Sequence, residues 1–494
     1  MPPYNRIDHP IGALDPPWPI ERRGAPRWFY IPVDQWVVIL VLAGIVAVCA
    51  IPAYESDSMW IGVGLFAAVV AVLHTLFAAR MVPWIPGLIA LMALLQWVIA
   101  PWAGYHTTPE LPVFAMSVPP DEYFSYAVPA AALLLLGLYT PLWRISQQPL
   151  PRRSVSTPAG FSRTCDAMIV FGFAANLLIN HSPDSLRYLM TLLSYLSFVG
   201  AFGHLLVRTP GWWWRVLAVL AVRAAMSTEN GLFHDLLLWA AYTGALAVFV
   251  ARPRVTTILA IVAASAFLIG VLNEAKYSYR RALQLNPGMP LVDRVAALTG
   301  TFENQASLPQ ETFTGDALTR IVTRLNQGWI IARILVWVPT SEPFARGETV
   351  MTAFRAALVP RLLDPGKYEA GGAINFPRFT GLTIAGGTSM NLSPAGEMYA
   401  NFGRNGGLFA MYLFGVGLGL VYLWFANAAQ SSPLWWAWAP YVMLYTMQAE
   451  NGIGEGVNHV AKSFLVMMAV VTYVPAWRTL RRWHLRRATR PVRA

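Results

Sequence analysis

Four residues with chemically useful side chains lie close together where the chain enters an apolar segment. The stretch SPAGEMYANFGRNGG (393–407) places Glu397, Tyr399, Asn401 and Arg404 just before LFAMYLFGVGLGLVYLWF. A carboxylate at a partly dehydrated site can act as a general base, and a guanidinium fork matches the oxygens of a phosphate. Capping of the following helix by Glu397 carries equal weight, because acidic side chains favour helix N-termini.

Further basic residues gather in the long segment that precedes this stretch. Those expected to bind an anionic substrate are Arg324, Arg355, Arg361, Lys367 and Arg378. Several converging cations suit a pyrophosphate, whereas each one taken singly is more commonly a solvated charge. The turn-rich strings DPGKYEAGG and TIAGGTSMN lie among them and can shape a loop site.

Ionisable residues also interrupt the apolar segments upstream. Arg223, His234 and Asp235 are the clearest examples. Charged groups in a membrane are costly, so they line cavities or pair with one another. We expect His234, Asp235 and Glu450 to stand behind Glu397 as candidate bases, and Arg223 to contact substrate. A purely structural Arg223–Asp235 pair that joins two helices carries equal weight.

The composition determines the class of protein. Of 494 residues, 56% are hydrophobic and only 12% are charged, which excludes a water-soluble globular fold. We expect an all-α polytopic membrane protein with about 12 transmembrane helices and a large extracytoplasmic loop that carries short amphipathic helices. The expected spans are 35–53, 59–79, 83–102, 124–143, 164–180, 186–207, 213–226, 231–251, 255–273, 405–425, 434–449 and 458–476.

The net charge of +11 is explained by where the basic residues lie. Outside the long segment nearly all of them occupy alternate loops and both ends of the chain, whereas the loops 55–58, 103–123 and 450–458 contain no lysine or arginine. The positive-inside rule then predicts that both termini are cytoplasmic. The basic surplus indicates orientation and attraction to membrane lipid, and we expect no nucleic-acid partner.

This topology divides the chain into five parts. They are a cytoplasmic tail (1–34), a nine-helix region (35–273), a large periplasmic loop with the site motifs (274–404), three further helices (405–476) and a basic cytoplasmic tail (477–494). Two amphipathic helices, 328–338 and 348–363, are expected either on the outer membrane surface or packed against the bundle. Gly415, Gly417 and Gly419 are expected to serve helix packing.

Two strings of the sequence resemble the oligosaccharide repeat-unit polymerases of bacterial surface polysaccharide assembly, the O-antigen or exopolysaccharide polymerases. In that family a basic residue followed by Leu or Asn opens the loop, a Pro-Arg pair leads to a Pro-x-Lys turn, and a Gly-Glu-x-Tyr-x-Asn-Phe-Gly box precedes the next helix. The matching positions here are Arg324, Asn326, Pro360, Arg361, Pro365, Lys367, Gly396, Glu397, Tyr399, Asn401, Phe402 and Gly403. Arg355 and Gly366 also reproduce an arginine-to-glycine spacing noted in some polymerase loops.

The resemblance implies a reaction at the outer face of the bacterial inner membrane. A growing glycan moves from undecaprenyl pyrophosphate to a sugar hydroxyl of another lipid-linked repeat unit, beside a flippase and a chain-length regulator as partner proteins. Arginines would stabilise the leaving pyrophosphate and Glu397 would act as base. The sequence contains no Asp-x-Asp motif and no histidine cluster with metal-ligand spacing, so we expect neither metal nor cofactor.

Two other functions stay open. A ligase that moves finished glycan from the same lipid would need the same outer phosphate site. A transporter or lipid flippase, the non-enzymatic alternative, should show polar residues through the full membrane depth or broken helices at its middle.

Overall fold

The structure is a computed structural model that describes residues 27–28, 31–55, 57–109, 111–144, 157–230, 234–262, 264–265, 315–359, 372–383 and 390–479. In these ranges the chain is almost entirely helical, and the strands β1 (Arg27–Trp28) and β2 (Ile31–Pro32) form one short antiparallel pair.

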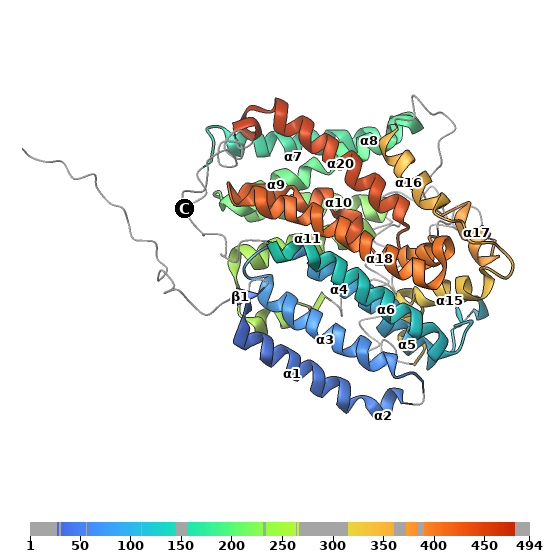
Figure 1. Cartoon of the computed structure of the whole chain (residues 1–494). Helices are drawn as coiled ribbons and strands as arrows, with labels where there is room; N and C mark the ends of the chain where they lie inside the picture. Colours follow the sequence, from blue (N-terminus) through green and yellow to red (C-terminus); the bar gives the residue numbers. More distant parts are fainter. Residues whose placement is uncertain are drawn as a thin grey trace, which may run out of the picture.

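The helices lie side by side in one bundle (Figure 1). Those of the first half are α1 (Val33–Cys49), α2 (Ile51–Tyr54), α3 (Trp60–Ala78), α4 (Ile85–Leu94), α5 (Ala100–Tyr105), α6 (Pro120–Tyr139), α7 (Phe161–Leu178), α8 (Asp184–Ser194), α9 (Leu196–Val207), α10 (Trp212–Asn230) and α11 (His234–Ala251). Those of the second half are α14 (Gly315–Leu325), α15 (Gly328–Trp337), α16 (Glu348–Leu358), α17 (Asn375–Thr380), α18 (Ser393–Ala429), α19 (Ala439–Val442) and α20 (Ile453–Tyr473). Short pieces are the π-helical η1 (Leu95–Ile99) and the 3-10 turns η2 (Pro112–Phe114), η3 (Thr140–Arg144), η4 (Ile179–His181), η5 (Pro433–Ala437) and η6 (Leu444–Met447).

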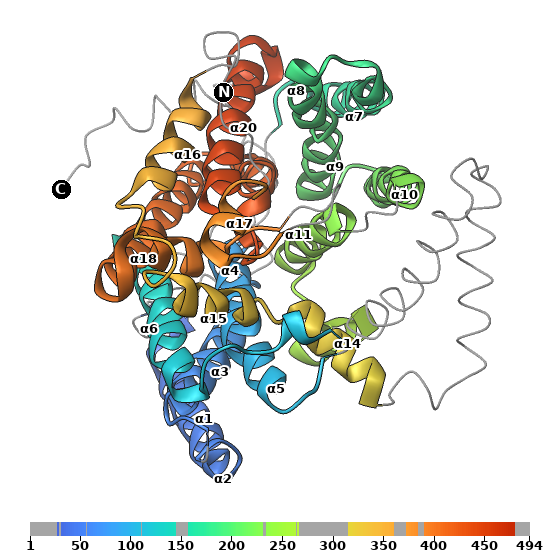
Figure 2. The same ribbon diagram turned by 90° about the vertical axis from the view of Figure 1, so that its right-hand side faces the viewer.

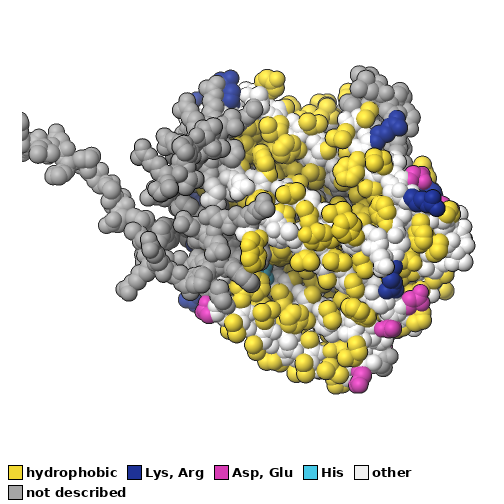
Figure 3. Space-filling model, viewed as in Figure 1, with side chains coloured by type: hydrophobic (Ala, Val, Ile, Leu, Met, Phe, Trp, Pro, Cys, Tyr) yellow, Lys and Arg dark blue, Asp and Glu magenta, His cyan; other side chains and the backbone are white. Residues whose placement is uncertain are grey.

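Six of the described helices are long and apolar enough to cross a membrane. They are Trp60–Ala78, Ile85–Tyr105, Pro120–Trp143, Phe161–His181, Asp184–Val207 and Ser393–Ala429. Hydrophobic side chains cover most of the face in Figure 3, and acidic and basic side chains gather at the rim where Figure 1 places α16 and α17. The expected class, an all-helical membrane protein, is therefore confirmed, while the count of twelve spans stays a prediction.

The expected span at 434–449 is not one continuous helix. The segment is broken into η5, α19 and η6 between the end of α18 and the start of α20, and its passage across the membrane stays a prediction. Pro433 and Pro440 lack backbone donors, and each stands at the start of a new helical piece. The high hydropathy that predicted a span comes from side chains such as Trp436 and Trp438, which are fully buried inside the protein. An irregular backbone is tolerated at membrane depth only in such a protein-lined setting.

Helix α18 is bent at Gly403, whose φ of 69° and ψ of −169° are essentially confined to glycine. The apolar part after the bend packs along α6. A Cβ on Gly415 would lie 2.2 Å from the carbonyl oxygen of Leu134, and one on Gly419 would lie 2.4 Å from that of Leu138. The predicted packing role is confirmed for these two glycines. It is wrong for Gly417, which is exposed and has open space beside it.

The part of α18 before the bend lies at one end of the bundle with α15, α16 and α17 (Figures 1 and 2). Helix α15 matches the expected helix at 328–338 and buries Trp329, Ile330, Ile331 and Ile334, so it packs into the bundle rather than lying on its surface. Helix α16 matches the start of the second expected helix but ends at Leu358, and it packs on α20.

Candidate functional site

Glu397 is a buried carboxylate at the meeting point of three helices. It is 5% exposed. Its Oε1 accepts a hydrogen bond from Thr349 Oγ1 of α16 at 2.7 Å, and its Oε2 accepts one from the backbone nitrogen of Ile453 at 2.8 Å. Within the described part of the chain no lysine or arginine pairs with it. A buried carboxylate held by hydrogen bonds alone is costly, which is typical of a functional group.

The capping alternative for Glu397 needs a correction. Helix α18 already begins at Ser393, so Glu397 does not cap its own helix. Ile453 is instead the first residue of α20, and the carboxylate accepts one of the backbone N–H groups that a helix start leaves unpaired. The positive end of the α20 dipole also favours a negative group there. Glu397 therefore anchors α20 to α18 and still presents its carboxylate to the surroundings described next.

Asn401 positions this carboxylate. It is 1% exposed, and its Nδ2 donates to Thr349 Oγ1 at 2.7 Å and to the backbone oxygen of Glu397 at 2.8 Å. The backbone nitrogen of Gly347 donates to Asn401 Oδ1 at 3.1 Å. Gly347 has a φ of +90°, which lets the chain turn tightly into α16. The whole amide is thus satisfied, and Thr349 is oriented with its hydroxyl proton toward Glu397.

Glu397 lines a pocket that we call the carboxylate pocket. It is open to solvent and is lined by Thr349, Ala353, Gly372, Asn375, Asn391, Leu392, Glu397, Gly452, Gly454 and Glu455. Side-chain amides and carboxylates dominate its polar lining, and such groups recognise hydroxyls.

A second carboxylate faces the same pocket. Oε2 of Glu455 and Oε2 of Glu397 lie 2.7 Å and 3.2 Å from the point that a Cβ would take at Gly452, so these two atoms are less than 6 Å apart. The sequence interpretation missed Glu455 and named Glu450 from the same loop instead. The string ENGIGEGVN offered a signal, because the glycines around Glu455 let the chain approach other elements closely.

Of the four clustered residues, Tyr399 and Arg404 do not line the carboxylate pocket. Arg404 donates to the backbone oxygen and Oγ of Ser125 on α6, each at 3.2 Å. The ring of Tyr399 packs edge-on against Tyr126 with centroids 5.1 Å apart. Residues 397 and 401 are one helical turn apart and share a face, whereas 399 lies on another face and 404 follows the bend at Gly403. The structure therefore brings only Glu397 and Asn401 together.

Arg378 on α17 is held by two carboxylates. Its Nε lies 2.6 Å from Glu342 Oε1, and its Nη1 lies 3.0 Å from Glu348 Oε1. Hydrogen bonds from Arg378 to Glu348 and Glu342 raise the pKa of the guanidinium above its ordinary value. These bonds join α17 to the start of α16, and Arg378 does not line the carboxylate pocket.

The structure describes two of the four remaining cations that we expect to bind substrate. Arg324 near the end of α14 and Arg355 on α16 are both exposed. Arg361 and Lys367, with the Pro-Arg and Pro-x-Lys motifs, lie outside the described residues. Lys367 stands five residues before Gly372, which lines the carboxylate pocket. Their convergence on a phosphate stays a prediction.

Arg223 and Asp235 form the expected pair, away from the carboxylate pocket. Arg223 Nη2 lies 2.6 Å from Asp235 Oδ2, and the hydroxyl of Tyr195 donates to the same oxygen at 2.6 Å. The Tyr195 hydroxyl is also 3.2 Å from that of Tyr445. This contact joins α9, α10 and α11, and the pair shares no lining residue with the carboxylate pocket. His234 begins α11, and its side chain lies outside the described part.

Among the described residues no group of three His, Cys, Asp or Glu side chains is arranged to hold a metal ion. The carboxylates, amides and hydroxyl that line the carboxylate pocket can transfer protons and form hydrogen bonds. Comparison of the chain with protein-family models, with curated proteins and with solved structures finds no match.

Proposed function

We propose that this protein is a membrane glycosyltransferase that polymerises undecaprenyl-pyrophosphate-linked oligosaccharide repeat units into a bacterial surface polysaccharide. The observation that carries the proposal is the carboxylate pocket. A buried carboxylate without a cation partner among the described residues opens to solvent at one end of an apolar helix bundle. A water-soluble glycan and a membrane-held lipid can meet at such a place, and the resemblance in sequence to repeat-unit polymerases includes Glu397 and Asn401.

In the proposed reaction Glu397 accepts the proton of a sugar hydroxyl on the acceptor repeat unit. The hydroxyl oxygen forms a bond to the anomeric carbon of the donor glycan, and the bond from that carbon to the pyrophosphate oxygen breaks. The electron pair leaves with undecaprenyl pyrophosphate. Thr349 and Asn401 hold Glu397 in place, which lowers the cost of reaching the reactive geometry.

The charges favour one arrangement of the two substrates. Glu397 and Glu455 would repel a diphosphate inside the carboxylate pocket, so the pocket suits the uncharged acceptor sugar. The diphosphate belongs beside it, where the positive end of α20 and the cations Arg361 and Lys367 of the adjoining segment would offset its charge.

The proposed enzyme lies in the bacterial inner membrane, crosses it about twelve times and has both termini in the cytoplasm. The arrangement of the bundle supports it. Helices α2 and α5, which adjoin the loops without lysine or arginine, lie at the same end as α15, α16 and α17, while β1 near the basic N-terminal segment lies at the other (Figure 1). The positive-inside rule places the β1 end in the cytoplasm.

A lipid-linked oligosaccharide flippase is the second candidate function. The broken segment η5–α19–η6 supports it, because transporters place interrupted helices around their substrate sites. A glycan ligase would use the carboxylate pocket in the same way as a polymerase, with a different acceptor.

Reconstitution of the purified chain with lipid-linked repeat units as the sole substrate tests the proposal. A polymerase makes a ladder of products on a gel, and Glu397→Gln removes that ladder while Glu122→Gln, on an exposed carboxylate in the first turn of α6, keeps it. A folded wild-type chain that makes no ladder would exclude polymerisation. Transfer only to an added lipid A core would indicate a ligase, and movement of lipid across vesicles without new linkages would indicate a flippase.

A further inference from the structure

Glu397 must release a proton in every cycle of the proposed reaction. Its carboxylate takes up the proton of an acceptor hydroxyl, and the next cycle requires the ionised form again. Glu397 is only 5% exposed, and its two oxygens already accept hydrogen bonds from Thr349 and Ile453. The proton therefore needs a route from this buried position to solvent.

Glu455 offers such a route. It stands in the first turn of α20, is half-buried, and lines the carboxylate pocket, which opens to solvent. Its Oε2 is less than 6 Å from Oε2 of Glu397. One water molecule that forms hydrogen bonds of about 2.8 Å to both oxygens spans such a distance.

Gly452 keeps the space between the two carboxylates open. Its φ of −71° and ψ of 165° are accessible to any L-amino acid, so the backbone does not require glycine here. A Cβ at this position would lie 2.7 Å from Oε2 of Glu455 and 3.2 Å from Oε2 of Glu397. Any side chain at position 452 would therefore push the Glu455 carboxylate away from Glu397.

No other described acidic or basic residue lines the carboxylate pocket. Other such residues occur on α20 and on the helices packed against it, and they are His459 and Lys462 on α20, Glu348 and Arg355 on α16, Asp184 and Arg187 on α8, and Arg404 on α18. Within the carboxylate pocket, Glu397 and Glu455 are therefore the two described groups that can exchange a proton.

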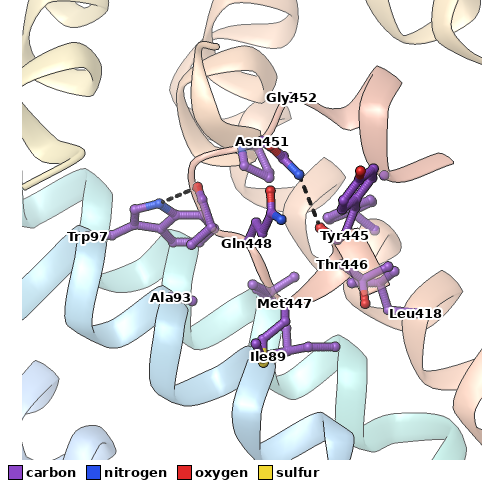
Figure 4. A pocket seen from close by; sticks show the side chains of 15 residues that line it. Ile89, Ala93, Trp97, Leu418, Tyr445, Thr446, Met447, Gln448, Asn451 and Gly452 are labelled. Carbon is purple, nitrogen blue, oxygen red and sulfur yellow. Dashed lines mark hydrogen bonds between the residues drawn. The ribbon is translucent and has the colours of Figure 1, made fainter. Parts of the chain in front are cut away.

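A second space next to Gly452 leads into the bundle (Figure 4). Its wall is mostly apolar, with side chains such as Ile89 and Met447, and it has room for one or two water molecules. Gln448 Nε2 is buried and donates to no described residue, so a water molecule there would satisfy it. The wall holds no carboxylate, lysine, arginine or histidine among the described residues, so it offers no such group to carry a proton to solvent.

We infer that Glu455 is the residue through which the proton taken up by Glu397 leaves for solvent. The O–H bond of protonated Glu397 breaks, the proton passes through a bridging water molecule to the Glu455 carboxylate, and from there it moves to bulk water. Glu397 is then ionised for the next acceptor. The inference rests on the proposed function, which makes Glu397 the base, and Glu455 acts only through Glu397.

Stabilisation of α20 is the structural alternative for Glu455. It is the third residue of the helix, where a glutamate can fold back on the helix start and where a negative charge suits the helix dipole. Such a role would change the stability of the protein but not the route of a proton.

The reconstituted polymerisation assay separates the two roles. Glu455→Gln should lower the rate of ladder growth on the order of tenfold or more, and sodium formate, whose carboxylate can enter the open pocket, should restore much of that loss. Sodium chloride at the same concentration should restore none of it. Glu455→Asp should keep more of the rate than Glu455→Gln, and Glu122→Gln should match the wild type with or without formate. A loss that formate does not restore, or a wild-type rate in folded Glu455→Gln, would overturn the inference.

Gly452→Ala tests the spacing without removing either carboxylate. Its Cβ displaces the Glu455 side chain, so the rate should fall severalfold. Gly456→Ala adds the same methyl group one turn further along α20, where it meets no atom within 4 Å, and should keep the wild-type rate. Thermal unfolding shows whether each variant is folded. Equal rates in the two folded variants would contradict the inference, and if Gly452→Ala does not fold, the Glu455 variants decide.

Infrared spectroscopy of the purified full-length chain tests the carboxylate pair without turnover. The C=O stretch of protonated Glu397 is the band that Glu397→Gln removes, and its intensity is followed against pH. Two carboxyl groups this close titrate as a pair, so the midpoint should shift by about one pH unit in Glu455→Gln and stay unchanged in Glu122→Gln. An unchanged midpoint in Glu455→Gln would overturn the inference. A shifted midpoint in a chain that makes no ladder would support proton exchange between the two groups and reject polymerisation.

Discussion

The carboxylate oxygen Oε2 of Glu397 lies 2.8 Å from the backbone nitrogen of Ile453, which joins the start of α20 to the turn of α18 that precedes its bend. One side chain thus has a structural contact on one oxygen and a hydroxyl partner, Thr349, on the other. The predictions below separate these roles.

Glu397→Gln keeps the size of the side chain and removes its charge. Its amide oxygen can still accept from Thr349, but its NH₂ group would face the N–H of Ile453, so the free energy of unfolding should fall by about 1 kcal/mol. Polymer should disappear from gels of surface glycan while single-repeat products remain. Wild-type chain length at wild-type protein level would rule out Glu397 as the base.

Asn401→Ala removes the amide that orients Thr349. The backbone nitrogen of Gly347 loses its acceptor, and the Thr349 oxygen loses the amide donor while its hydroxyl can still donate to Glu397. The variant should therefore be destabilised by about 2 kcal/mol in thermal or denaturant unfolding and should make less polymer. Asn427→Ala, on an exposed position of the same helix, is the matched control and should change stability by less than about 0.5 kcal/mol. Equal effects at both positions would contradict the positioning role.

The Arg223–Asp235 pair can be tested with single and double leucine variants. Each single change leaves a partly buried charge unpaired and should cost about 3 kcal/mol, whereas the double change removes both charges and should recover most of that loss. Polymer synthesis in the folded double variant then distinguishes the two roles. Normal chain length would show that the pair only joins α10 and α11, and loss of polymer would show that Arg223 contacts substrate.

Arg361→Ala tests the cations of the Pro-Arg motif. Removal of a phosphate contact should abolish polymer while leaving the amount of membrane-inserted protein unchanged, because the leaving diphosphate loses a stabilising charge. Arg163→Ala, at an exposed position in the first turn of α7, is the control and should keep full chain length. A polymer ladder that is unchanged in Arg361→Ala would remove Arg361 from the site.

Gly415→Leu tests the packing of α18 on α6. A side chain there would meet the backbone of Leu134, so the helices must separate and the chain should lose about 2 kcal/mol or more of stability. Gly417→Leu faces open space and should be neutral. Comparable unfolding temperatures for the two variants would show that the glycine contact does not hold the helices together.

Local features of the site could be predicted from the sequence. The one-turn spacing of Glu397 and Asn401 puts both on one helix face, and the glycine at 403 marks the turn in the chain. Thr349 and Glu455 could not be found in this way. They reach Glu397 from separate helices, and only the packing of α16 and α20 brings them there.

The breaks within 434–449 could not be predicted for a related reason. A hydropathy window measures how apolar a segment is, but it cannot distinguish a helix that faces lipid from a buried segment that faces protein. The tryptophans of this segment are compatible with a lipid-facing helix and with a buried segment, and its prolines were the only local sign of the breaks.

Because of the bend at Gly403, one continuous stretch of chain provides both the long apolar helix that packs on α6 and the short helical segment that carries Glu397. The backbone angles of Gly403, which favour glycine, set the direction of the first ten residues of α18 relative to the rest of the helix. They therefore also set the position of the Glu397 side chain. Any other amino acid at position 403 would disfavour these backbone angles and redirect residues 393–402, so Glu397 would move relative to Thr349 and Ile453 although neither partner was changed.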